Sequence, residues 1–178
     1  IPLPNKLGLI LDDFHLIMPK LLVKEGDTVK RGQPIFYSKA NDNIKFVSPS
    51  HGKIDKIVRG ERRKILEIII STHKIDSAIK HEIPALEKIK RENIIDTLLE
   101  SGCWPFIKQR PFDIIADPLQ NPKSIFISCF DSAPLSVDFE FILKDQIESF
   151  KYGLKILDKI TPGNLNIGVN KNQEFLNK

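Results

Sequence analysis

Few side chains of this chain have both the type and the setting that chemistry requires. Lys39 stands in a polar stretch between apolar segments and precedes Ala40, so its amine is a candidate attachment point for a covalent group. Asp131 follows the apolar run 124–130, where α/β proteins often hold a functional carboxylate, but a loop-start Asp that accepts nearby N–H groups is commoner. No Ser/His/Asp or Cys/His set can be assembled from the sequence. We therefore predict no catalytic residue in this chain.

Sites for metal ions and for phosphate groups are not predicted either. None of the four histidines has a suitable ligand three or four residues away, and Cys103 and Cys129 form no Cys-x-x-Cys pair. Phosphate binding needs glycines that let backbone N–H groups approach an anion at the start of a helix. The chain contains neither Gly-x-Gly-x-x-Gly nor a Walker A loop. We expect this chain to bind no metal and no nucleotide or flavin cofactor of its own.

The composition is that of a globular protein and argues against two other classes. The chain has 178 residues, 41% hydrophobic and 28% charged, enough for one large or two small domains. Its net charge of +4 is scattered, and its densest basic stretch, Arg59–Lys64, is interpreted as a solvated hairpin rather than a nucleic-acid site. No apolar run approaches the roughly 18–20 residues that cross a bilayer, and the first residues do not resemble a signal peptide.

Hydrophobic patterning and turn residues predict four successive stretches. Residues 1–19 are expected to be an extended lead-in, and residues 20–70 a β-rich module. Residues 71–85 are polar, end in Ile-Pro-Ala and suit a linker. From residue 86 the apolar spacing becomes helical, and residues 86–178 are predicted to be the start of a Rossmann-like parallel α/β domain, incomplete in this chain.

The β-rich module consists of two imperfect copies of one unit, Lys20–Phe36 and Lys53–Ile70. Two such units facing each other make a flattened barrel, the barrel-sandwich hybrid shape of biotinyl and lipoyl carrier domains. Carriers modify a lysine in the tight hairpin between the half-units, and Lys39-Ala40 resembles the Lys-Ala pair of lipoyl domains. The biotin pattern Met-Lys-Met is missing. We expect the polar insertion Asn41-Asp42-Asn43 to move Lys39 from the tip onto a strand edge, which favours an unmodified lysine.

The second half of the chain has the order strand, helix, strand. Apolar residues at helical spacing are followed by Gly102, where a left-handed helix C-cap is predicted. The uncharged run 124–130 predicts a strand buried on both faces, and the apolar spacing from Phe139 to Leu157 predicts one long amphipathic helix. A short strand is expected at 165–169. This order implies a parallel sheet with a right-handed crossover.

Two long motifs carry a family resemblance. Residues 100–113 contain Ser-Gly-x-Trp and Arg-Pro-Phe, and residues 122–135 contain Pro-x-x-Ile-Phe and Asp-x-x-Pro-Leu. Both are similar to the A subunit of the Na⁺-translocating NADH:quinone oxidoreductase, as are Pro19–Val29 and Lys45–Pro49 in the β-rich module. The resemblance extends from about Asp13 to about Gly163. Family members are considerably longer, so this chain resembles their N-terminal portion.

The resemblance implies a peripheral protein on the cytoplasmic face of the bacterial inner membrane, with other subunits of the same complex as its partners. That complex oxidises NADH, reduces ubiquinone or menaquinone and exports sodium ions, with NADH, flavins, iron–sulfur centres and quinone on other subunits. Relatives of the α/β domain cradle a cofactor in a glycine-rich loop, which Gly102–Phe106 replaces here. A carrier modified on Lys39 and a scaffold of a related electron-transfer complex are kept as alternatives.

The remaining role for this chain is assembly or contact with quinone. Quinones favour apolar and aromatic linings with a few polar anchors, and interfaces between subunits have similar compositions. For Trp104, plain core packing is an equally good interpretation. The candidate contact residues are Trp104, Phe106, Arg110, Phe112, Phe126 and Asp131.

Overall fold

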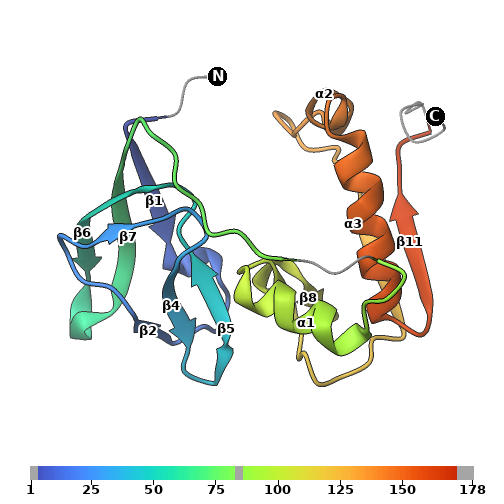
Figure 1. The fold of residues 1–178 in the computed structure, drawn as a ribbon, viewed down its shortest axis with the longest axis horizontal. Coiled ribbons are helices and arrows are strands. Elements are labelled where there is room, and N and C mark those ends of the chain that lie inside the picture. Colours follow the sequence, from blue (N-terminus) through green and yellow to red (C-terminus); the bar gives the residue numbers. More distant parts are fainter. Residues whose placement is uncertain (1–3, 83–85, 172–178) are drawn as a thin grey trace. The chain divides into compact units, whose positions relative to one another are not determined.

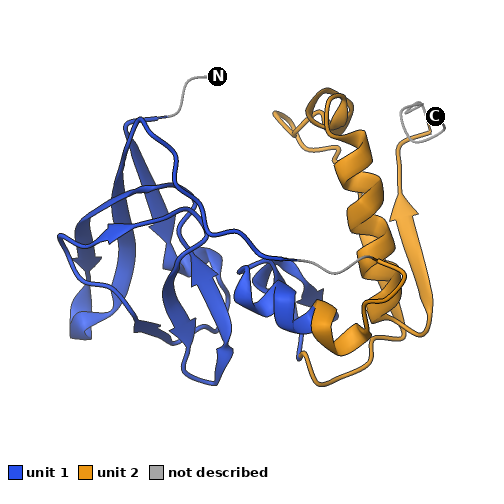
Figure 2. Cartoon of the chain, in the orientation of Figure 1, with its two compact units in different colours: residues 1–84, 95–117 blue, residues 85–94, 118–178 orange. Residues whose placement is uncertain are grey.

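The computed structural model describes residues 4–82 and 86–171, which fall into two compact units (Figure 1). Unit 1 comprises residues 1–84 and 95–117, and unit 2 comprises residues 85–94 and 118–178 (Figure 2). Unit 1 holds the β-rich module and unit 2 holds the parallel strands with their crossover helix. Among the described residues, no helix is long and apolar enough to span a bilayer.

Unit 1 is built on two antiparallel sheets. The first has the strand order β1-β7-β6-β3, with bounds Lys6–Ile10, Ile65–Thr72, Gly52–Arg59 and Thr28–Val29. The second has the order β2-β4-β5, with bounds Pro19–Leu21, Pro34–Ser38 and Asn41–Val47. Over the described residues the two sheets do not close into a barrel.

The core of unit 1 follows from alternation along the strands. Successive side chains of a strand point to opposite faces, so Ile68 and Ile70 of β7 are both buried on the same face. From the other sheet, the rings of Phe36 and Phe46 stack at a centroid distance of 4.4 Å. Phe14, in the loop after β1, meets Phe46 edge to face at 4.6 Å. Aromatic and aliphatic side chains thus hold the module together without a disulfide.

Strand β1 lies within the stretch predicted to be a lead-in. Residues 6–10 pair antiparallel with β7, from Lys6 opposite Ser71 to Ile10 opposite Glu67. The one-turn 3-10 helix η1, Leu11–Asp13, follows and buries Leu11. The sheet therefore takes in residues before position 20. Their few turn signals fit a strand, but its partner is far along the chain and local patterning does not show that pairing.

Helix α1, Arg91–Glu100, ends as its sequence predicts. Gly102 has a φ of +70°, the left-handed conformation that glycine adopts without a Cβ penalty. The N–H of Cys103 donates to the carbonyl of Leu98 at 3.0 Å, and that of Gly102 donates to Leu99 at 3.3 Å. This pair of bonds is a Schellman cap, so the predicted left-handed C-cap is confirmed.

The segment after the cap stays with unit 1. The one-turn 3-10 helix η3, Trp104–Phe106, packs against β5 and leads into the two-stranded ribbon of β8, Lys108–Gln109, and β9, Ile114–Ile115. The predicted boundary at residue 86 assigned this segment to the α/β domain. Residues 95–117 belong to unit 1, where Trp104, Pro105 and Ile115 are buried, and the domain boundary at residue 86 stays a prediction.

The described part of unit 2 contains a parallel strand pair, two complete helices and the first turn of α1. Strands β10, Ser124–Ser128, and β11, Asn164–Gly168, run parallel with Ser124 opposite Asn164, which confirms the predicted parallel pairing. Helix α3, Ile147–Ile160, connects toward β11 and packs on it. The Thr161 hydroxyl donates to the carbonyl of Pro122 at 2.8 Å and accepts the N–H of Gly163, which ties the starts of both strands together.

Two predictions for unit 2 are wrong. The single long helix from residue 139 is split into α2, Phe139–Leu143, and α3, because the N–H of Gln146 bonds back to Leu143 in a tight turn. Strand β10 is not buried on both faces, since Phe126 is 80% exposed. The lack of charge in the run 124–130 therefore does not by itself indicate a strand with two covered faces.

Candidate functional site

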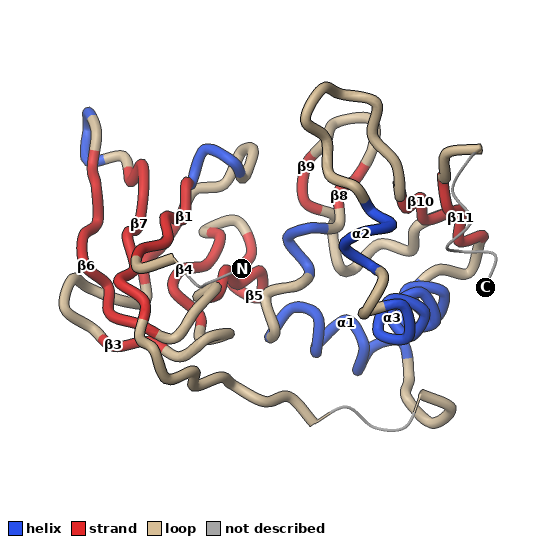
Figure 3. The backbone as a smooth tube through the Cα atoms, turned by 90° about the horizontal axis from the view of Figure 1, so that it is seen from above, coloured by secondary structure: helices blue, strands red, loops and turns tan. Residues whose placement is uncertain are grey.

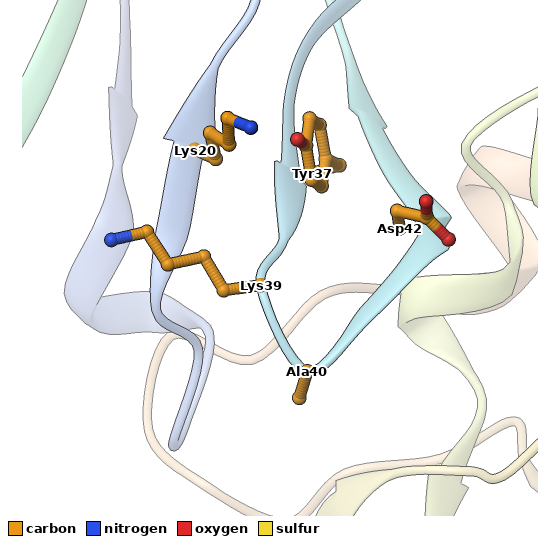
Figure 4. Close-up of a pocket in the computed structure, with 5 residues that line it drawn as sticks. All are labelled: Lys20, Tyr37, Lys39, Ala40 and Asp42. Atoms are coloured by element: carbon orange, nitrogen blue, oxygen red, sulfur yellow. The ribbon is translucent and has the colours of Figure 1, made fainter.

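Lys39 lies at the tip of the β4–β5 hairpin. Ser38 pairs with Asn41, so Lys39 and Ala40 form a two-residue turn (Figure 4). The predicted shift of Lys39 onto a strand edge is therefore wrong. The next pair is Tyr37 with Lys45, so the extra polar residues bulge out of β5 and leave the turn unchanged. The N–H of Asn43 donates to Oδ1 of Asn41 at 3.1 Å and closes this bulge.

A hollow of about 540 Å³ lies beside this turn, between the hairpin and β2. It is lined by Lys20, Tyr37, Lys39, Ala40 and Asp42 (Figure 4). The Nζ of Lys20 lies 5.5 Å from the centroid of the Tyr37 ring, and a side-chain hydrogen bond with Tyr37 raises the pKa of Lys20. The side chain of Lys39 points away from Tyr37. Its amine is directed toward the β2 side of the hairpin in Figure 4, and the side chain is exposed.

Trp104 is buried in unit 1, with 3% of its surface exposed. Its Nε1–H donates to the carbonyl of Ala116 at 2.7 Å, which ties η3 to the end of the β8–β9 ribbon. Burial and this bond give Trp104 a packing role, the alternative that the sequence left open. Its contact with quinone or another subunit stays a prediction.

Three of the candidate contact residues form the exposed part of the same segment. Phe106 and Phe112 are 73% and 69% exposed. Arg110 is also exposed, and its guanidinium forms an ion pair with Oδ1 of Asp113 at 3.4 Å. The ring of Phe106 touches Phe14 edge to face at 6.5 Å, so one edge rests on the module while the rest faces outward. Large exposed rings beside a cation suit an apolar or aromatic ligand, or a protein interface.

The other two candidates lie in unit 2. Phe126 projects from β10 into an exposed position, and Asp131 lies in the loop that follows. Oδ1 of Asp131 accepts the N–H of Ala133 at 2.9 Å, which is the loop-start role that the sequence made the commoner interpretation. The six candidates thus fall into two groups, four in unit 1 and two in unit 2.

One feature of unit 1 was missed by the sequence reasoning. A hollow of about 720 Å³ lies between the loop that follows β1 and the turn that joins β6 to β7. The turn supplies most of the Arg59–Lys64 stretch, and the loop supplies apolar residues from 11 to 19. The basic run was a visible signal, but its apolar neighbours come from a distant segment. Within residues 4–82 and 86–171, no group of three metal-binding side chains is placed to hold an ion.

The fold defines a class of protein. Two facing antiparallel sheets with a hairpin-tip lysine make a carrier-like module, and a parallel strand–helix–strand unit follows it. The sequence comparisons agree with this division. Residues 1–73 match the NqrA N-terminal barrel-sandwich hybrid domain, and residues 89–178 match the NqrA second alpha/beta domain. The chain therefore belongs to the NqrA family, and the predicted family and fold class are both confirmed.

Curated relatives carry the corresponding name. The chain is 36% identical over 153 residues to the A subunit of the Na(+)-translocating NADH-quinone reductase of Marinomonas sp. (strain MWYL1), an alignment of 85% of this chain and 34% of that protein. It is 35% identical over 169 residues to the protein of the same name from Yersinia pseudotuberculosis serotype O:1b (strain IP 31758), covering 93% and 38% of the two chains. The chain spans little more than a third of the length of these relatives.

Proposed function

We propose that this chain is part of a peripheral subunit of a sodium-pumping respiratory complex, on the cytoplasmic face of the bacterial inner membrane. The complex transfers electrons from NADH to ubiquinone or menaquinone. The observation that carries the proposal is the succession of two NqrA domains along one chain, at residues 1–73 and 89–178. Relatives named as the A subunit of the Na(+)-translocating NADH-quinone reductase align with more than four-fifths of this chain and support the same role.

Within that complex, we propose that this chain carries no cofactor of its own. A phosphate cradle needs backbone N–H groups that are free to point at the anion. After α1 the N–H groups of Gly102, Cys103, Phe106 and Ile107 already donate within the chain, and Pro105 has none. A glycine at this position serves as a helix cap, and the buried ring of Trp104 follows it. These contacts support a structural role for the segment.

We propose further that the exposed group Phe106, Arg110 and Phe112 contacts quinone or a neighbouring subunit. Aromatic side chains and arginine are enriched at protein interfaces and carry much of their binding energy. The rings of Phe106 and Phe112 are exposed, so the core of unit 1 does not use most of their apolar surface. These three residues make the contact with quinone or the neighbouring subunit, and Trp104 holds them in place.

The test is a variant of the full-length protein in its native membranes. Phe106→Ala with Phe112→Ala is expected to lower sodium-stimulated NADH:quinone reductase activity, or recovery of the assembled complex, by about 30-fold, equivalent to about 2 kcal/mol. The control, Leu22→Ala with Ile75→Ala, removes two other exposed apolar side chains of unit 1 and is expected to leave both readouts unchanged. Unchanged activity and unchanged assembly in the Phe106/Phe112 variant would remove the contact role.

A second candidate function rests on one observation. Lys39 occupies a two-residue hairpin tip between the half-units, the place where carrier domains hold their modified lysine. If the chain is a carrier, the protein purified from its native cells has the mass increment of a biotinyl or lipoyl group on Lys39. An unmodified chain from those cells excludes this function, and the role in the respiratory complex does not depend on it.

A further inference from the structure

The larger hollow of unit 1 combines cations and exposed apolar side chains on one face. We call it the basic-apolar hollow. Its lining includes Leu16, Met18, Arg59, Arg62, Arg63 and Lys64. The two short 3-10 helices beside it are η1, after β1, and η2, Glu61–Arg63, between β6 and β7; both project from the same side of the module in Figure 3.

The charge of the basic-apolar hollow is strongly one-sided. Asp12 lines it and pairs with Lys64 at 2.6 Å, which accounts for one of the cations. For Arg62 and Arg63 the described residues provide no carboxylate partner within 4.0 Å. Both have positive φ values, 52° and 61°, a conformation that non-glycine residues seldom adopt, and both side chains are exposed at the turn. Lys39 adds a further cation at the rim.

The apolar part of the hollow is exposed rather than packed. Leu16 is 75% exposed and Met18 is 64% exposed, and Leu16 also has a positive φ of 61°. Beneath them, Phe14 is fixed against Phe46 at 4.6 Å and against Phe106 at 6.5 Å. Phe14 is therefore held by the aromatic core, while the exposed side chains of Leu16 and Met18 line the same hollow as Arg62 and Arg63.

We infer that the basic-apolar hollow docks on the surface of an anionic lipid bilayer. Lys and Arg side chains near such a surface are attracted by phosphate headgroups, and adjacent aliphatic side chains enter the boundary of the acyl region. Arg62 and Arg63 supply the charge, and Leu16 and Met18 supply the apolar contact. Single-stranded nucleic-acid sites present aromatic rings for stacking, whereas the most exposed apolar side chains of this hollow, Leu16 and Met18, are not aromatic. The inference uses residues of unit 1 alone and is independent of the proposed respiratory function.

The test is co-sedimentation of the 178-residue chain with vesicles. We expect binding to vesicles of phosphatidylcholine with one-third phosphatidylglycerol, weakened by salt, and no binding to pure phosphatidylcholine. Arg62→Gln with Arg63→Gln is expected to lower the partition coefficient by about 25-fold, or about fivefold for each cation removed. The matched control, Lys53→Gln with Lys56→Gln, removes two exposed cations from β6 and is expected to bind as the parent chain does.

A second variant tests the apolar contact. Leu16→Asn is expected to lower the partition coefficient by about tenfold, because asparagine tolerates positive φ but contributes no apolar burial. The inference is overturned if anionic vesicles do not bind, if the Lys53/Lys56 control loses binding equally, or if Leu16→Asn has no effect. Saturable binding to a protein partner that Arg62→Gln with Arg63→Gln abolishes, without vesicle binding, would likewise overturn it.

Discussion

Replacing Trp104 with alanine is expected to lower the free energy of unfolding of this chain by about 3–5 kcal/mol. The ring belongs to η3 and is almost completely buried, so its removal leaves a cavity. The substitution also takes away the donor to the carbonyl of Ala116, which is left without that hydrogen bond. The loss is measured by urea unfolding followed by circular dichroism, because Trp104 is the sole tryptophan and its fluorescence disappears with it.

The control for this substitution is Phe106→Ala in the same 3-10 helix. Phe106 is largely exposed, so its removal is expected to change the free energy of unfolding by less than about 1 kcal/mol. Equal effects of the two substitutions would contradict the packing role of Trp104. If Trp104→Ala is destabilised as expected, a loss of quinone reductase activity in that variant is a folding effect, which is why the contact proposal is tested at Phe106 and Phe112.

Replacing Gly102 with alanine is expected to lower the free energy of unfolding by about 2–4 kcal/mol. The left-handed backbone at this position is strained for any residue with a Cβ. In addition, a Cβ built there would lie 2.6 Å from Cγ1 of Val47, whose branched side chain is stiff about χ1 and has little freedom to move away. Thermal and urea unfolding of the purified variant measure the change.

A second substitution separates the two causes. Val47→Ala removes the methyl groups that the new Cβ would strike, while the backbone strain remains. The double variant is expected to be more stable than the sum of the single effects by about 1 kcal/mol or more. Strictly additive effects would show that Gly102 is required for its φ alone and that its contact with β5 contributes nothing.

Local patterns predicted the elements that depend on local chemistry. The end of α1 could be predicted because the apolar spacing stops where Gly102 allows a left-handed cap. The parallel pairing of β10 with β11 followed from the order strand, helix, strand. The position of Lys39 could not be predicted in the same way. It depends on the register of β4 against β5, and a bulge absorbs the insertion that appeared to lengthen the turn.

The sequence predicts which residues of the candidate site have suitable side chains, but it does not predict which of those side chains are exposed. Trp104 and Phe106 are equal candidates by residue type, although one lies in the core and the other on the surface. Phe126 was expected inside a covered strand and is exposed. The basic-apolar hollow was missed because its arginines and its exposed apolar side chains come from distant segments, which the pairing of β1 with β7 and the Asp12–Lys64 ion pair bring together.

Native mass spectrometry of the chain purified from its own cells, with FMN and NADH added, tests the central claim most directly. If the N–H groups of the segment after α1 are used by hydrogen bonds within the chain, neither FMN nor NADH binds there. The measured mass then stays that of the polypeptide alone at micromolar FMN and NADH. A stoichiometric complex with either molecule, or a lipoyl or biotinyl increment on Lys39, would contradict the claim that this chain is free of cofactors.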